Sequence, residues 1–261
     1  MKLAVLGLGE AGSLIARGLM DQGVDVVGFD PAKPKYPPVP LMESAEAAVA
    51  EADVVFSINS SNASIRLAQQ VAPHLKPGAL YCDLNTGTPS LKVKLSSLLP
   101  EGSFVDVAVM KPVPGSAEKV PMGISGAGAQ KLMELFKGLD LNLTYVSEVP
   151  GEAAARKLLR SIFAKGMAAV VIDYLWAAQE MGLADWALEE VMSEFDASSR
   201  KTVKRYLSGT AKHAKRRSVE MADVVAMLSE IGYDSTMVGP IELTLNRIIH
   251  SKKIPFSDLE D

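Results

Sequence analysis

The sequence of 261 residues predicts an α/β domain built on a parallel sheet, followed by an all-helical domain. Two observations predict the first domain. Short apolar runs alternate with helical stretches over residues 1–150, and the first run leads directly into a glycine-rich motif at residues 7–12. One observation predicts the second: from Ala153 onward no strand signal remains. The sequence therefore divides into residues 1–150 and 151–261.

The predicted strands of the first domain are continuous apolar runs, which is typical of parallel strands covered on both faces. Strands are expected at 3–8, 24–30, 53–59, 79–85, 103–110, 121–126 and 143–147. Helices are expected between them, at 13–21, 45–52, 65–75, 89–99 and 129–135.

The second domain begins with one long predicted helix. Residues 153–182 contain no proline and a single interior glycine, Gly166, which allows a helix of about 30 residues. Its predicted apolar face comprises residues 158, 159, 162, 163, 166, 167, 170 and 174, with Lys157, Ser161 and Ala168 on the opposite side. Further helices are expected at 184–208, 212–231 and 236–250. The length of the apolar face favours a homodimer paired through the helical half.

Composition excludes several classes of protein. A net charge of −4 argues against wholesale binding of nucleic acid or an anionic membrane. The single cysteine, Cys82, excludes an internal disulfide, and three isolated histidines give no metal-ligand spacing. The N-terminal apolar run ends at Glu10 without a cleavage site, and no run is long enough to cross a bilayer. We expect a cytoplasmic protein without metal.

The motif Gly7-Leu8-Gly9-Glu10-Ala11-Gly12 has the form G-x-G-x-x-G between a predicted strand and a predicted helix. Gly7 permits the tight turn, Gly9 lets the backbone approach a pyrophosphate, and Gly12 allows close helix–strand packing. The helix N-terminus supplies unpaired N–H groups for the phosphates. These features predict a Rossmann domain that binds a dinucleotide.

Asp30 ends the second predicted strand, where a carboxylate can bind the ribose hydroxyls. A carboxylate repels a 2′-phosphate, so Asp30 favours NAD. Lys33 and Lys35 follow it and leave NADP open, although a solvated loop is the preferred explanation for both lysines.

Four stretches extend the glycine motif in a recognisable order: GLGEAG at 7–12, DLNTGTP at 83–89, FVDVAVMKPVPG at 104–115 and GEAAARK at 151–157. With them the chain resembles the β-hydroxyacid dehydrogenase family, which includes 3-hydroxyisobutyrate and 6-phosphogluconate dehydrogenases. Its C-terminal stretch 216–232 is similar to a subgroup whose helical domain has no assigned function.

The resemblance implies roles for particular residues. The family's general acid/base lysine on the interdomain helix corresponds to Lys157, and the asparagine one turn later is replaced by Ser161. The threonine near the nicotinamide ribose corresponds to Thr86, with Asn85 in place of a serine. The family's cofactor-contacting loop corresponds to Asn59 and Ser60.

Two departures bear on the substrate. The family's substrate-binding Ser-Gly-Gly is Met110-Lys111-Pro112 here, and the late K-D-L motif does not align cleanly, with Val219-Glu220 in its place. Asn85, Lys111, Ser161 and Arg217 are therefore the candidate contacts to a small, anionic substrate.

Without the family, Lys157 is a lysine near the positive end of a helix, where burial beside a cofactor favours the neutral amine. A neutral amine can take a hydroxyl proton, whereas a solvated lysine without chemistry is the plain alternative. We expect an NAD(P)-dependent oxidoreductase acting on a hydroxy acid or a polar alcohol. An imine reductase on the same scaffold and a non-catalytic dinucleotide sensor are the alternatives.

Residues 200–217 hold eight lysines and arginines and no acid: Arg200, Lys201, Lys204, Arg205, Lys212, Lys215, Arg216 and Arg217. This basic block is interpreted mainly as a solvated helical hairpin around Ser208-Gly209. An anion-recruiting surface is the alternative, and no recognition-helix or aromatic signature supports nucleic acid.

Overall fold

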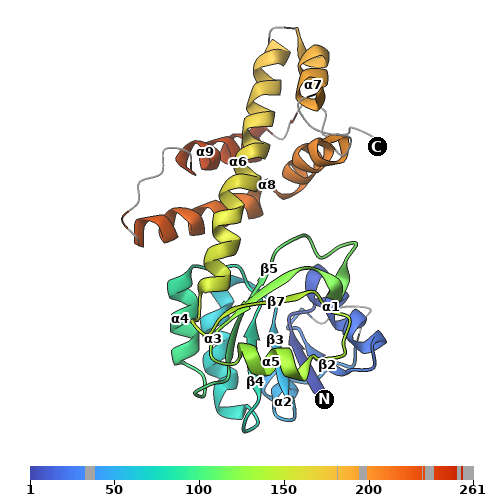
Figure 1. Cartoon of the computed structure of the whole chain (residues 1–261), viewed down its shortest axis with the longest axis vertical. Coiled ribbons are helices and arrows are strands. Elements are labelled where there is room, and N and C mark those ends of the chain that lie inside the picture. The colour runs from blue at the N-terminus through green and yellow to red at the C-terminus, as the bar shows by residue number, and fades with distance from the viewer. Residues whose placement is uncertain are drawn as a thin grey trace. The chain divides into compact units, whose positions relative to one another are not determined.

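The computed structural model describes residues 1–32, 39–180, 182–193, 199–230, 232, 238–251 and 254 (Figure 1). Lys33 and Lys35 lie outside the described residues. The chain forms two compact units, Met1–Lys157 and Leu158–Asp261. The predicted boundary at Pro150-Gly151 coincides with the start of helix α6 (Glu152–Glu180), whereas the two units divide inside that helix.

The first unit contains one seven-stranded sheet in the order β2-β1-β3-β4-β5-β6-β7. Its strands are β1 (Lys2–Leu6), β2 (Asp25–Phe29), β3 (Val54–Ser57), β4 (Leu80–Asp83), β5 (Phe104–Val109), β6 (Met122–Ser125) and β7 (Leu143–Ser147). Each predicted strand is present, shortened by up to three residues.

The expectation of an entirely parallel sheet is wrong at one pair, because β5 and β6 run antiparallel. The segment between them holds only the short 3₁₀ helix η2 (Ala117–Lys119). A parallel pair needs a longer crossover, usually an α-helix. The remaining pairs are parallel.

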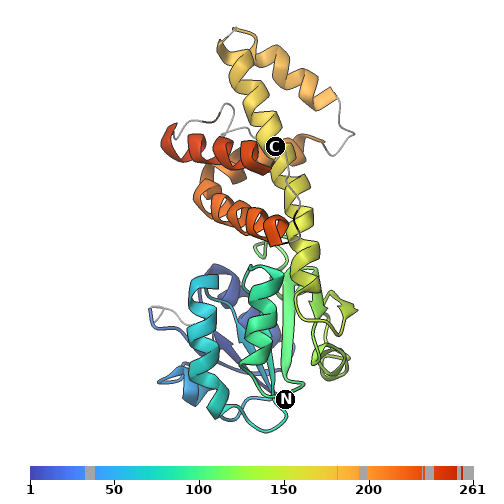
Figure 2. The same cartoon turned by 90° about the vertical axis from the view of Figure 1, so that its left-hand side faces the viewer.

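Helices cover both faces of this sheet: α1 (Glu10–Asp21), α2 (Ala45–Val49), α3 (Ser61–Val71), η1 (Ala72–His74), α4 (Pro89–Ser97) and α5 (Ala129–Leu135). Neighbouring strand residues point to opposite faces, so Leu3 and Val5 pack with α1 and α5, whereas Ala4 and Leu6 pack with α2, α3 and α4. Helices α3 and α4 lie side by side on the second face (Figure 2). The two apolar cores hold the sheet rigid beneath the loops at its edge.

The regular secondary structure of the second unit, among its described residues, is helical: it contains most of α6, with α7 (Ala184–Ser193), α8 (Ser199–Glu230) and α9 (Val238–Ser251). The predicted hairpin at Ser208-Gly209 is wrong, since α8 runs through both residues. The helical backbone breaks instead at His213, with φ −122° and ψ 19°.

The predicted apolar face of α6 is also wrong in part. Leu159, Phe163, Val170 and Tyr174 are exposed, whereas Ala168, expected on the opposite side, is buried. The core of this unit is formed by another face of α6, which includes Ile172 and Leu175. Within the described residues, the helices lack the combination of length and apolar composition that a membrane span requires.

Candidate functional site

The sheet topology defines where a ligand can bind. From β1 the chain crosses to β2 on one side, and then to β3 and β4 on the other. The loops that follow β1 and β3 therefore separate at the carboxyl edge of the sheet. In open α/β sheets this point of reversal is where ligands bind.

The glycine motif lies at this edge, between β1 and α1. Gly7 has φ +107°, and a Cβ built on it lies 2.1 Å from the carbonyl oxygen of Ile58. A Cβ on Gly12 lies 2.0 Å from the carbonyl oxygen of Gly7. A Cβ on Gly9, in contrast, meets nothing within 4 Å. Gly7 and Gly12 are thus required by the fold, whereas Gly9 leaves space for a ligand.

The remaining motif residues frame the same loop. Glu10 and Ala11 begin α1, so their backbone N–H groups belong to its first turn, which can bind phosphate. The Leu8 N–H donates to Oδ2 of Asp30 at 2.7 Å. This bond holds the predicted ribose-binding carboxylate against the glycine loop, so the residues present fit a dinucleotide.

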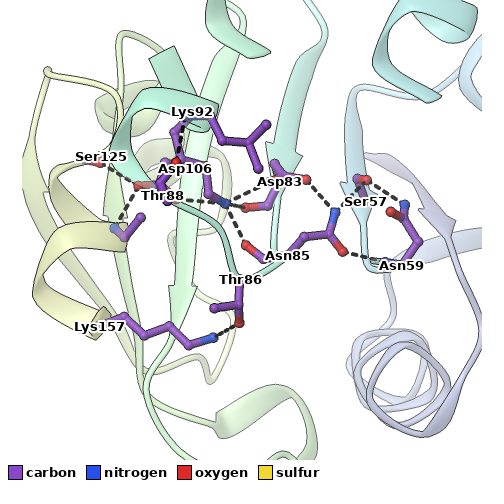
Figure 3. A network of polar contacts seen from close by, with 12 residues as sticks. Ser57, Asn59, Asp83, Asn85, Thr86, Thr88, Lys92, Asp106, Ser125 and Lys157 are labelled. Carbon is purple, nitrogen blue, oxygen red and sulfur yellow. Dashed lines mark hydrogen bonds and ion pairs between the residues drawn. The ribbon is translucent and has the colours of Figure 1, made fainter. Parts of the chain in front are cut away.

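The loops after β3 and β4 are joined by amide hydrogen bonds (Figure 3). The Asn59 N–H donates to Oδ1 of Asn85 at 2.6 Å, and the Asn85 carboxamide donates to Asp83 Oδ1 at 2.6 Å. Ser60 is the residue before α3. Asn85, which the sequence predicts as a substrate contact, is buried, and its amide holds the two loops together.

Thr86 and Lys157 are brought together although they are far apart in sequence. The Lys157 Nζ donates to Oγ1 of Thr86 at 2.6 Å (Figure 3). Both side chains are half-buried. The Thr86 hydroxyl is on the loop that follows β4, and the Lys157 amine of α6 lies beside it. An amine held in this way can exchange a proton with a bound substrate.

Beneath this pair lies a buried charged network. The Lys92 Nζ contacts Asp83 Oδ2 at 2.7 Å and Asp106 Oδ1 at 3.1 Å, and the three side chains are almost completely inaccessible. Burial disfavours the ammonium, but the Asp106 and Asp83 carboxylates outweigh this effect and raise the pKa of Lys92. Lys92, Asp83 and Asp106 are not among the site residues predicted from the sequence. The signal for this network in the sequence is one aspartate in each of two otherwise apolar strands, Asp83 in β4 and Asp106 in β5. A buried strand gives no reason for a charged side chain unless that side chain has a partner.

The comparisons identify the family. The NAD binding domain of 6-phosphogluconate dehydrogenase matches residues 2–139, more than half of the chain. The chain belongs to the β-hydroxyacid dehydrogenase family. Residues 178–248 match a domain of unknown function, DUF1932. The helical C-terminal domain therefore places the chain in the predicted subgroup of the β-hydroxyacid dehydrogenases.

Solved structures agree with this membership. A conserved hypothetical protein from Sinorhizobium meliloti is 30% identical, with a TM-score of 0.74 over 94% of this chain and 87% of that one. Mycobacterium tuberculosis 3-hydroxyisobutyrate dehydrogenase, solved with L-serine, has a TM-score of 0.80 at 18% identity over 98% and 96%. An imine reductase from Myxococcus stipitatus, in complex with NADP+, has a TM-score of 0.63 at 16% identity over 98% of both chains.

The other three predicted substrate contacts belong to different units, Lys111 to the first and Ser161 and Arg217 to the second. Lys111 is exposed in the segment after β5. Ser161 is buried in the second unit and accepts from Lys165 Nζ, which also pairs with Glu220 at 2.6 Å. Arg217, in the same unit, donates to Thr210, and its burial lowers its pKa. In the described structure, Ser161 and Arg217 are therefore engaged with neighbours of their own unit.

Proposed function

We propose that this member of the β-hydroxyacid dehydrogenase family is an NAD(P)-dependent oxidoreductase. It would act on the carbinol group of a small hydroxy acid or a related polar alcohol. The bond between Lys157 and Thr86 carries this proposal. It positions an amine at the carboxyl edge of the sheet, on the side of the glycine loop where a nicotinamide cofactor would bind.

Each part of the site has a role in this proposal. Gly9 and the first turn of α1 would hold the pyrophosphate, and Asp30 would hold the ribose. The bound nicotinamide supplies the hydride acceptor or donor. Lys157 takes the proton from the substrate hydroxyl in oxidation and returns it in reduction, while Thr86 fixes the direction of the amine. An anionic substrate is favoured by the exposed Lys111.

The preferred cofactor is NAD, since both carboxylate oxygens of Asp30 are held in place. Oδ2 accepts from Leu8, and Oδ1 accepts from Ala32 at 2.8 Å. A fixed carboxylate at this position repels a 2′-phosphate. We expect NADH to bind more tightly than NADPH, and Asp30→Ala to reduce or reverse this preference.

The decisive test is turnover of a panel of hydroxy acids and polar alcohols with NAD+ and with NADP+, followed at 340 nm for the wild type and Lys157→Ala. We expect the variant to lose about 10²–10⁴-fold in kcat, with cofactor affinity retained. Normal turnover by Lys157→Ala would overturn the catalytic assignment. Tight cofactor binding without turnover of any compound would favour the dinucleotide sensor.

Imine reduction is the second candidate, because solved imine reductases share the fold. A lysine ammonium that gives its proton to the oxygen of a C=O bond can equally give it to the nitrogen of a C=N bond while the carbon takes up hydride. Cyclic imines with NADH or NADPH are therefore included in the panel. A higher kcat/KM for an imine than for every carbonyl substrate would replace the first candidate by the second.

We also propose a homodimer that buries the exposed apolar side chains of α6. Leu159 and Phe163 are 55% and 69% exposed, and Val170 continues the same helix face. Contiguous exposed apolar surface is characteristic of protein interfaces, and a second copy of the chain supplies an identical apolar face.

A further inference from the structure

We propose that Lys92 is a positioning residue that fixes Thr86 and Lys157 at reacting distance. The proposal rests on the proposed role of Lys157. Lys92 is on α4 and has polar contacts with Asp83, Asn85 and Asp106. Through them it acts on the two backbone segments that carry Thr86 and Lys157, namely the loop at 84–88 and the first turn of α6.

Lys92 holds the loop directly. Its Nζ donates to the carbonyl oxygen of Asp83 at 3.1 Å and to that of Asn85 at 2.8 Å, besides the Asp83 carboxylate (Figure 3). Asn85 immediately precedes Thr86. The ammonium thus binds the main chain on one side of the threonine, while Thr88 caps α4 on the other by accepting from the Leu91 N–H at 3.2 Å.

Lys92 holds the start of α6 through Asp106. Oδ2 of Asp106 accepts from the Ala154 N–H at 2.9 Å, and Ser125 Oγ accepts from the Ala153 N–H at 3.0 Å. These are N–H groups of the first helical turn, which side chains next to the helix in sequence usually cap. Here residues of β5 and β6 cap it, so the start of α6, up to Lys157, is fixed to the sheet of the same unit.

At Gly151 the backbone before α6 packs directly against the first residue of α4. Gly151 precedes α6 with φ +96°, and a Cβ built on it would lie 2.8 Å from the carbonyl oxygen of Pro89, the first residue of α4. The loop that ends at α4 and the turn that begins α6 are therefore in direct contact. A shift of either one changes the Thr86–Lys157 distance.

The chemistry of the network explains why a lysine is suited to this task. Two buried carboxylates repel each other, and one fully buried ammonium between them converts this repulsion into two ion pairs. An apolar side chain of similar length would fill the volume but would bind neither Asp106 nor the carbonyl oxygens. We therefore expect Lys92→Met to release the loop from the helix without altering Thr86 or Lys157 themselves.

The test measures the environment of Lys157 without any substrate. Trace acetylation followed by peptide mass spectrometry gives the reaction rate of the Lys157 amine in folded protein. Thr86→Ala, which lacks the hydroxyl, defines how that rate changes when the bond is lost. We expect Lys92→Met to change the rate in the same direction, and the matched control Lys94→Met, exposed on the same helix, to leave it unchanged.

A kinetic measurement follows with whichever substrate the panel identifies. Displacement of a catalytic group by about 1 Å costs on the order of 10²-fold in rate, so we expect Lys92→Met to lower kcat by about that factor with the NADH dissociation constant unchanged. If Lys92→Met does not fold, Asp106→Asn carries the same test, since it keeps the volume and leaves Lys92 paired with Asp83. Folded variants with wild-type Lys157 acetylation would overturn the positioning role. Absence of any wild-type substrate would count against the proposed function alone.

Discussion

The two units differ in the charge of the polar side chains that they bury completely. Among the described residues, the first unit buries Lys92, Asp83 and Asp106 completely, and all three lie close to the carboxyl edge of its sheet. The second unit buries two uncharged hydroxyl residues, Ser161 and Thr210, within an otherwise apolar core. It exposes large apolar side chains along α6 instead. Buried charge is costly, so its concentration at one edge indicates a positioned site, whereas exposed apolar surface indicates a partner.

The largest effect is expected from Lys92→Met in the first unit. Removing one partner from a buried ion pair leaves uncompensated charge and typically costs about 3–5 kcal/mol. Because the pKa of Lys92 is raised, its stabilising contribution is present at neutral pH and is lost only when the pH rises through that raised value. Lys94→Met, at an exposed position of α4, is expected to change the free energy of unfolding by less than about 0.5 kcal/mol.

Cys82 provides a reporter for this measurement. It is buried on β4 of the first unit, and burial raises the pKa of its thiol well above the ordinary value. The thiolate is the reactive form, so alkylation should require unfolding of this unit. The urea concentration at which labelling begins should fall for Lys92→Met. An unchanged value would show that the network contributes no stability.

The next effect is expected in the apolar core of the second unit. Leu175 is fully buried there, and Leu175→Ala should cost about 2–5 kcal/mol through the lost methyl groups and the cavity. Trp176 and Trp186, the two tryptophans of the chain, both belong to this unit, so their fluorescence during urea denaturation reports its unfolding. If Leu175→Ala lowers the free energy of unfolding by less than about 1 kcal/mol, the surrounding side chains must move to fill the cavity.

Two glycine substitutions sharpen the assignment of the ligand site. Gly12→Ala forces a Cβ against the Gly7 carbonyl and should cost about 1–3 kcal/mol of stability as well as cofactor affinity. Gly9→Ala meets no neighbouring atom, so we expect unchanged stability but weaker NADH binding, measured by fluorescence titration. Undiminished NADH binding by Gly9→Ala would place the pyrophosphate elsewhere.

The smallest effect on folding is expected at Phe163. Because its side chain is largely exposed, Phe163→Asp should change the free energy of unfolding by less than about 0.5 kcal/mol. The same substitution should shift a dimer towards monomer in sedimentation velocity. A wild-type protein that sediments as a monomer at every concentration would contradict the proposed pairing.

Much of this architecture follows from local pattern. Apolar runs are enough to predict the seven strands, and the glycine positions are enough to predict the loop at Gly7. Both are local patterns, because they depend on residues that are close together in the sequence. The antiparallel β6 and the kink at His213 do not follow, since strand direction and helix continuity depend on what packs against them. The burial of Ala168 was missed for the same reason: helical periodicity defines a face of α6 but not what packs against it.

The sequence by itself was enough to predict the glycine loop as a nucleotide site, Asp30 as its neighbour, and Thr86 and Lys157 as site residues through their motifs. Only the tertiary structure decided what holds that pair together. Lys92, Asp106 and Ser125 belong to three different elements, and they meet only when β5 and β6 pair beside α4. Buried charges stabilise a fold through partners distant in sequence, and no spacing along the chain encodes those partners.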